Sequence, residues 1–183
     1  AFTATADKIT KEDIVQQLGL TKDDRGEATV FVSSFDRPNL SLDVRRGYSA
    51  KDKQRFIMAL IARHPGESGI IYCMSRKTTE SVAAKLQEKG VRAMAYHAGL
   101  SASGRDRVQE AFINDEIDVV CATIAFGMGI DKGNVRWVIH YNLPQSIESF
   151  YQEIGRAGRD GAPADTILFY SLADVIQRKS FAE

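Results

Sequence analysis

Apolar residues in this chain follow two alternating patterns from residue 69 onward. Short continuous runs rich in Ile, Val and Tyr alternate with longer segments in which apolar positions recur every three or four residues. The continuous runs predict buried strands, and the longer segments predict helices with one apolar face. The expected strands are 69–73, 91–96, 117–122, 135–141 and 166–170, and the expected helices are 77–89, 103–114, 147–154 and 173–181.

The N-terminal part shows the same patterns less regularly. A helix is expected at 50–63, where apolar residues recur at helical spacing before a Pro-Gly pair. Residues 40–45 alternate apolar and polar side chains, which is typical of a half-exposed strand at a sheet edge. A β-branched run predicts a strand at 28–33, and Thr10 can cap a short helix that Gly19 ends.

Strands that alternate with helices indicate βαβ units and a mainly parallel sheet with helices on both faces. The expected fold class is therefore α/β, with three layers. In such sheets ligands bind beyond the carboxyl ends of the strands. The residues that follow each strand are accordingly the first candidates for a functional site.

Composition limits the classes of protein that fit. The chain has 183 residues, of which 44% are hydrophobic, so it can fill the core of one domain with an additional arm. Lys and Arg total 24, as do Asp and Glu, so nucleic-acid binding would have to come from a local patch. The two cysteines, Cys73 and Cys121, each lie in an apolar run, which indicates buried thiols rather than a disulfide or a metal site.

No run approaches the ~18 apolar residues that suggest a membrane span, and the first residues do not form a signal peptide. The expectation is a soluble, intracellular protein. Because the chain begins with AFTATADK and has no initiator methionine, it is expected to be an excised fragment.

Polar residues follow several predicted strands. Ser75 stands before a helix, where its hydroxyl could hold a phosphate or simply cap the helix, and Arg76 adds a positive charge. His97 ends another strand and is either a structural histidine or part of a site. In the loop 123–131, Thr123 could donate to a backbone phosphate and Asp131 could orient an arginine, or the loop could be an ordinary flexible turn.

The stretch SFYQEIGRAGRDG at 149–161 carries two arginines three residues apart, Arg156 and Arg159. If the turn is helical, their guanidiniums share one face. Arginine presents a planar fork of donors that matches phosphate oxygens, so the pair fits a polyphosphate. The alternative is a solvated basic turn at a helix end. Since no G-x-x-x-x-G-K-[ST] motif and no clear magnesium-holding acidic pair occurs, the arginines would complete a site whose phosphate cradle lies elsewhere.

Six ordered blocks together resemble RecQ-family DNA helicases of superfamily 2: AFTATA, SSFDRPNL, GIIYCMSR, AYHAGL, ATIAFGMGIDKGNVRWVIHYNLP and SFYQEIGRAGRDG. The resemblance implies a RecA-like, P-loop NTPase-like fold. It assigns 1–27 to the end of the first RecA-like lobe and a linker, and 28–183 to the second lobe. It also implies ATP-dependent 3′ to 5′ DNA unwinding by the full protein, with ATP and Mg²⁺ bound mainly by the first lobe, which this chain lacks. The family's zinc-binding segment is not expected in this fragment.

The resemblance also implies roles for individual residues. Arg159 would be the arginine finger and Arg156 a second phosphate contact. The other nucleotide-binding positions would be Gln152, Gly129 and Asp131, and the single-stranded DNA contacts would be Ser75, Arg76, His97 and Thr123. The chain departs from the family at Gly133, where proline is frequent, which predicts a looser loop.

The implied partners are single-stranded or duplex DNA and the first lobe of the same chain, in a monomer. The location would be cytoplasmic, at the nucleoid, in a bacterium or nuclear in a eukaryote. Two alternatives stay open. The second lobe of a DEAD-box RNA helicase shares the fold, but usually carries H-R-x-G-R-x-G-R, where this chain has Gln152-Glu153 in place of the His-Arg pair. The second alternative is a non-catalytic module that binds single-stranded nucleic acid or a protein partner.

Overall fold

The computed structural model describes residues 8–19, 36–123, 126 and 130–180, and divides the chain into two units, Ala1–Arg37 and Pro38–Glu183. In the first unit it describes one helix, α1 (Lys8–Gln17), which is followed by Gly19 at φ +53°. The short helix that Gly19 ends is as predicted, but Thr10 lies inside it and not at its N-cap, because the helix already begins at Lys8. The predicted strand at 28–33 and the proposed end of a preceding lobe at 1–27 fall largely outside the described residues, so both stay predictions.

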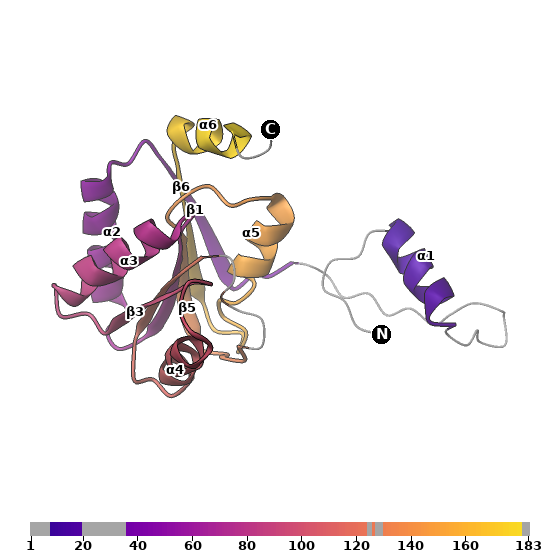
Figure 1. Ribbon diagram of the computed structural model, residues 1–183, viewed down its shortest axis with the longest axis horizontal. Coiled ribbons are helices and arrows are strands. Elements are labelled where there is room, and N and C mark those ends of the chain that lie inside the picture. Colours follow the sequence, from indigo (N-terminus) through magenta and orange to yellow (C-terminus); the bar gives the residue numbers. More distant parts are fainter. Residues whose placement is uncertain (1–7, 20–35, 124–125, 127–129, 181–183) are drawn as a thin grey trace. The chain divides into compact units, whose positions relative to one another are not determined.

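The second unit is built on a six-stranded sheet with the order β1-β6-β5-β2-β4-β3 (Figure 1). Every neighbouring pair in this sheet is parallel. The strands are β1 (Leu40–Arg46), β2 (Ser68–Tyr72), β3 (Ala93–Tyr96), β4 (Val119–Ala122), β5 (Val135–His140) and β6 (Ala164–Tyr170). The parallel sheet predicted from the sequence is confirmed, and so is the edge position of the half-exposed strand β1.

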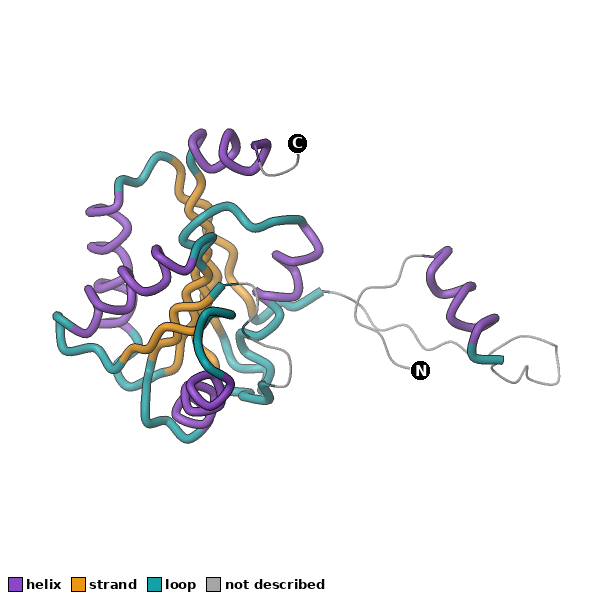
Figure 2. Tube along the Cα trace, viewed as in Figure 1, coloured by secondary structure: helices purple, strands orange, loops and turns teal. Residues whose placement is uncertain are grey.

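Helices cover both faces of the sheet, which gives the expected three layers (Figure 2). Strand residues alternate between two apolar clusters, as a period of two requires: Ile70 and Val138 pack with α4, whereas Ile71 and Ile139 pack with α2 and α3. The helices are α2 (Ala50–Arg63), α3 (Arg76–Gln87), α4 (Ala102–Ile113), α5 (Ile147–Ile154) and α6 (Leu172–Ser180). Helix α5 lies on the same face as α4, and α6 follows the last strand.

The helix starts are set by local sequence. Four serines stand at the N-caps of α2 to α5, and each side chain accepts a hydrogen bond from a backbone N–H of the first turn: Ser49, Ser75, Ser101 and Ser146. Such caps satisfy amides that have no partner within the helix. They therefore fix where each helix begins after the strand or loop that precedes it. Within the described part of the chain, no helix is long and apolar enough to cross a membrane.

Candidate functional site

The two arginines lie in a turn that begins where α5 ends. Gly158, between them, has φ +55°, a left-handed conformation that breaks helical geometry and favours glycine. The condition under which Arg156 and Arg159 would share a helical face, a helical turn, is therefore not met. Arg156 is half-buried and Arg159 is exposed. The Gly158 N–H donates to the carbonyl of Val135, the first residue of β5, at 2.8 Å, so the turn passes close to the amino end of that strand.

Arg159 contacts the segment that follows β4. Its Nη1 donates to the Ile130 carbonyl at 3.2 Å, and its Nε donates to the Gly155 carbonyl at 3.4 Å. The same Nη1 lies 3.9 Å from Oδ1 of Asp131, whose side chain is fully exposed. The structure thus brings together Arg159 and Asp131, as the sequence suggested. The Arg159 side chain is 38% exposed, and the 3.9 Å separation from Asp131 makes this a loose ion pair, so an anion from solvent can reach the guanidinium.

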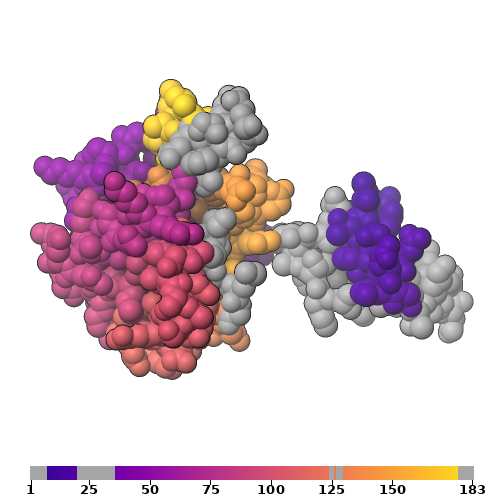
Figure 3. Space-filling model, viewed as in Figure 1, coloured from indigo at the N-terminus to yellow at the C-terminus, as the bar shows by residue number. Residues whose placement is uncertain are grey.

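Arg156 lies close to Tyr72, a buried tyrosine at the end of β2. Burial raises the pKa of the Tyr72 hydroxyl well above its usual value, and the positive charges of Arg156 and Arg159 act in the opposite direction. The Tyr72 hydroxyl donates to the Phe126 carbonyl at 3.2 Å. The arginine turn therefore lies against Tyr72, and Tyr72 also holds Phe126 in the segment after β4. Gln152, one turn earlier, is exposed on α5, which reaches the surface as the orange segment in Figure 3.

Three groups outside the predicted site hold this turn, and sequence reasoning assigned none of them. Arg136 on β5 donates to Oδ1 of Asp160 at 2.6 Å and to the Gly133 carbonyl at 3.4 Å. That hydrogen bond holds the pKa of the Asp160 carboxyl below its usual value. The Asp160 N–H in turn donates to the Gly133 carbonyl at 3.2 Å. The segment around Gly133, expected to be looser, is thus tied to the arginine turn.

The second group is a buried pair beneath α5. Nε2 of His140, at the end of β5, lies 2.6 Å from Oε2 of Glu153, and the two side chains are 1% and 7% exposed. The His140 ring also packs against Tyr72 and Phe150. The pair therefore fixes the last turn of α5 on the sheet immediately before Arg156. The third group is Asn39, whose side-chain amide donates to two carbonyls of the turn, those of Gly158 and Ala162.

The remaining candidate residues lie at the carboxyl ends of β2, β4 and β3, which are neighbours in the sheet. Ser75 is the N-cap of α3: its Oγ accepts from the Thr78 N–H at 3.1 Å and lies 2.9 Å from the Thr78 hydroxyl. The capping alternative is thus observed directly. Arg76, next to it, is exposed at the first turn of the helix, where its charge and the helix N-terminus both favour an anion.

His97 is buried and already has partners. Its Nε2 lies 2.9 Å from Oε1 of Glu80, and its Nδ1 accepts from the Gly99 N–H at 3.2 Å. A Cβ at Gly99 would lie 3.2 Å from Nη1 of Arg76, so Arg76 reaches across to the turn after β3. Thr123 joins this group, because its N–H donates to the carbonyl at the end of β3. The structure therefore collects these residues at one rim, with His97 in a supporting position.

The rim and the arginine turn are separate places joined by the segment 123–131. Thr123 begins it at the rim, and Ile130 and Asp131 end it beside Arg159. Between them, Phe126 is buried at 1% exposure and packs edge-on against two other aromatic rings. Gly129 lies outside the described residues. In the described ranges, no three His, Cys, Asp or Glu side chains are arranged to hold a metal ion.

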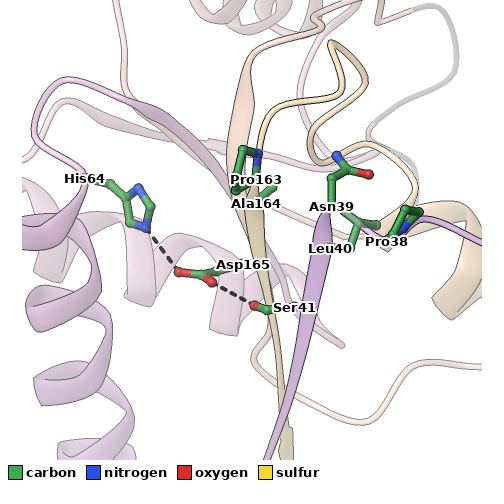
Figure 4. Close-up of a pocket in the computed structure, with 8 residues that line it drawn as sticks. All are labelled: Pro38, Asn39, Leu40, Ser41, His64, Pro163, Ala164 and Asp165. Atoms are coloured by element: carbon green, nitrogen blue, oxygen red, sulfur yellow. Dashed lines mark hydrogen bonds and ion pairs between the residues drawn. The ribbon is translucent and has the colours of Figure 1, made fainter.

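A cavity of about 380 Å³ opens at the amino ends of β1 and β6 (Figure 4). Across it, Oδ2 of Asp165 lies 3.2 Å from Nε2 of His64, and Oδ1 of Asp165 accepts from the Ser41 hydroxyl at 2.7 Å. The serine does not contact the histidine, so this is not a nucleophile–base pair. Nothing in the sequence pointed to this cavity, because its lining comes from three distant segments: Pro38, Asn39, Leu40, Ser41, His64, Pro163, Ala164 and Asp165.

Comparison with known proteins places this geometry in a family. The model described as "Helicase conserved C-terminal domain" matches residues 52–161. An ATP-dependent DNA helicase RecQ from Pasteurella multocida is 50% identical over 95% of this chain, which covers 26% of that protein. The RecQ-like DNA helicase BLM from Xenopus laevis is 49% identical over 96% of this chain, covering 12% of that protein. The similarity to RecQ helicases is confirmed, and the chain spans a minor part of these relatives.

Solved structures support the fold. Dbp5 from S. cerevisiae, solved bound to Gle1, has a TM-score of 0.76 at 21% identity and is covered by this chain over 45% of its length, with 98% of this chain aligned. A DEAD box protein from Methanococcus jannaschii has a TM-score of 0.68 at 24% identity, with 98% and 47% coverage. These likenesses establish the RecA-like fold class that was predicted.

Proposed function

Because the chain belongs to the helicase conserved C-terminal domain family, we propose that it is the second motor lobe of an ATP-dependent DNA helicase. In this proposal the full protein unwinds DNA in the 3′ to 5′ direction, and the first lobe supplies the phosphate-binding loop and the Mg²⁺ site. The described residues fit that division, since they offer an exposed guanidinium. Residues 1–27 would then belong to the first lobe and the connection.

The proposed role of Arg159 follows from its charge and its anchoring. ATP hydrolysis builds negative charge on the transferred phosphoryl group, and a guanidinium that reaches it stabilises the transition state, an effect worth roughly 10³ to 10⁵ in rate. Two backbone carbonyls orient Arg159 without neutralising it, and its contact with the carboxylate of the fully exposed Asp131 is loose at 3.9 Å. Arg156, half-buried beside Tyr72, would make a second phosphate contact, and Gln152, Gly129 and Asp131 would be the other nucleotide-binding positions.

At the rim, we assign Arg76 and Thr123 to the phosphates of single-stranded DNA. Ser75 would contribute through the helix N-terminus that it caps, and His97 would support the position of the Gly99 turn and thereby that of Arg76. Contacts of this kind read the backbone and not the sequence. The segment 123–131 joins the two places, so a change at Arg159 on hydrolysis can alter the grip on DNA.

The DEAD-box alternative is less well supported. The solved DEAD-box structures share 21% to 24% identity with this chain, whereas the DNA helicases share about half of its residues, 50% and 49%. One measurement on the full-length protein distinguishes a motor role of this lobe from a non-catalytic role.

That measurement is DNA-stimulated ATP turnover. We expect Arg159→Ala in the full-length helicase to lower kcat by roughly 10³-fold or more while changing the KM for ATP much less, since the lost interaction belongs to the transition state. Gln54→Ala, on α2 at the opposite face, is the control that should leave both constants unchanged. An unchanged kcat in Arg159→Ala would remove Arg159 from the site and favour the non-catalytic module.

A further inference from the structure

Asn39 touches the arginine turn at two points on either side of Arg159. Its Nδ2 donates to the Gly158 carbonyl and to the Ala162 carbonyl, each at 2.9 Å. Its own backbone carbonyl accepts from the Ala164 N–H, also at 2.9 Å. One residue therefore fixes the start and the end of the turn and its exit into β6.

The Asn39 amide also packs closely against Gly158. A Cβ at Gly158 would lie 2.5 Å from Nδ2 of Asn39 and 2.7 Å from the Ala162 carbonyl oxygen, distances that real Cβ atoms do not adopt. Gly158 has φ +55°, so glycine is favoured there for its conformation as well. The turn thus closes around the amide of Asn39, and it cannot shift as a unit without breaking two hydrogen bonds.

Asn39 lies at the point where the chain enters the second unit. It is the second residue of the unit that begins at Pro38, and it directly precedes the edge strand β1. Proline locks its own φ at about −65°, so Pro38 restricts the direction from which the chain leads into Asn39. Arg159 is consequently tied to the point at which the chain enters this unit, 119 to 123 residues away in sequence from the carbonyls that Asn39 holds.

We propose that Asn39 is a positioning residue for Arg159: its amide holds the turn in the one conformation in which the guanidinium faces the nucleotide. This inference rests on the proposed function of Arg159. Asn39 itself does not touch the reacting groups. A displacement of about 1 Å in a group that stabilises a transition state can cost on the order of 10²-fold in rate, so the loss of two anchoring hydrogen bonds is expected to appear in kcat.

The test uses the full-length helicase and DNA-stimulated ATP turnover. Asn39→Ala should lower kcat roughly 10- to 100-fold while leaving the KM for ATP and the affinity for single-stranded DNA nearly unchanged. Gln87→Ala is the matched control, because the Gln87 amide also donates to a backbone carbonyl, that of Ala93, at 2.7 Å, but far from the turn. A purely structural role for Asn39 predicts equal kcat values for the two variants.

The double variant Asn39→Ala/Arg159→Ala distinguishes a positioning role of Asn39 from an unspecific loss of structure. If Asn39 acts through Arg159, Asn39→Ala should add almost nothing to Arg159→Ala, since groups that act as a unit are not additive. If the two losses multiply, the inference is overturned. Should Asn39→Ala unfold, Asn39→Ser carries the same test, because it removes the amide that donates to both carbonyls and adds no charge beside Arg159.

The two proposals fail in different ways. An Arg159→Ala variant with normal kcat overturns the proposed function and the inference with it. A slow Arg159→Ala variant beside an Asn39→Ala variant that behaves like Gln87→Ala overturns the inference alone.

Discussion

Gly69 on β2 faces the largest fully buried side chain of the described core, Trp137 on the neighbouring strand β5. A Cβ at Gly69 would lie 2.0 Å, 2.2 Å and 2.2 Å from three carbons of the indole ring. Since an ordinary contact begins near 3.4 Å, the ring would have to move by 3.4 − 2.0 = 1.4 Å. We therefore expect Gly69→Ala to be strongly destabilising although it adds a single methyl group.

The size of the effect follows from the surroundings of the ring. Trp137 is completely buried among Ile139, Ile71 and the residues of α2 and α3, and protein interiors are packed as densely as organic crystals. Overpacking of such a core typically costs 1–3 kcal/mol, and a forced shift of more than 1 Å places this substitution at about 3 kcal/mol or above.

Urea denaturation of the chain, followed by far-UV circular dichroism and by the fluorescence of its single tryptophan, measures the loss. Gly133→Ala is the control, because its Cβ would meet nothing closer than 3.8 Å. In a Trp137→Leu background, where the ring is gone, Gly69→Ala should cost much less. If Gly69→Ala unfolds at the same urea concentration as Gly133→Ala, the close packing of these two strands is refuted.

Three further outcomes are expected. Arg76→Ala should weaken single-stranded DNA binding uniformly across sequences and reduce the slope of log K against log salt by roughly 0.7; an unchanged slope would remove Arg76 from the phosphate contacts. The hydrogen bond from Lys132 lowers the pKa of Asp115, so the stability it contributes is present above the unfolded pKa of about 3.9 and is lost as the pH falls through the lower folded value. Acid denaturation of Asp115→Asn should accordingly show a smaller fall in stability across that window than the parent chain does. Burial raises the pKa of the Cys73 thiol to about 12 and that of Cys121 well above its usual value, so neither should react with a thiol reagent at pH 8 until the chain unfolds; reaction at the rate of a free thiol would contradict this.

The fold could be predicted from the sequence because its signals are local. Apolar runs and helical spacing placed the strands and helices of the second unit, and the alternation at 40–45 indicated an edge strand. Two predicted strands, 91–96 and 117–122, are shorter in the structure. At their starts the guanidinium of Arg92 pairs with the Asp118 carboxylate at 2.6 Å, and the Arg92 carbonyl accepts from the Asp118 N–H. These residues connect the strands without continuing them.

The architecture of the site could not be predicted in the same way, since it depends on contacts between distant residues. The arginine spacing suggested a helical face, but one glycine with a positive φ separates Arg156 from Arg159. Asn39 stood in the quoted SSFDRPNL block with no assigned role, and its partners lie more than a hundred residues away. His140 and Glu153 are 13 positions apart, and neither the strand pattern nor the helix pattern shows that they meet.

In the proposed function one lobe contacts both a nucleotide and DNA, and the positions of these contacts fit that arrangement. Asn39 and the buried His140–Glu153 pair under α5 both anchor the arginine turn to the sheet. The segment that leads to the rim is held at both ends, where the Thr123 N–H donates to the Tyr96 carbonyl and the Ile130 carbonyl accepts from Arg159. Between them, Phe126 is held by the Tyr72 hydroxyl and two aromatic rings. The charge of Arg156 acts on the Tyr72 hydroxyl, so in the proposed function a change in the nucleotide contacts of the turn would act first on Tyr72 and on Phe126, to which Tyr72 donates. Densely packed side chains move together, and Thr123, three residues before Phe126, is where that movement would reach the DNA.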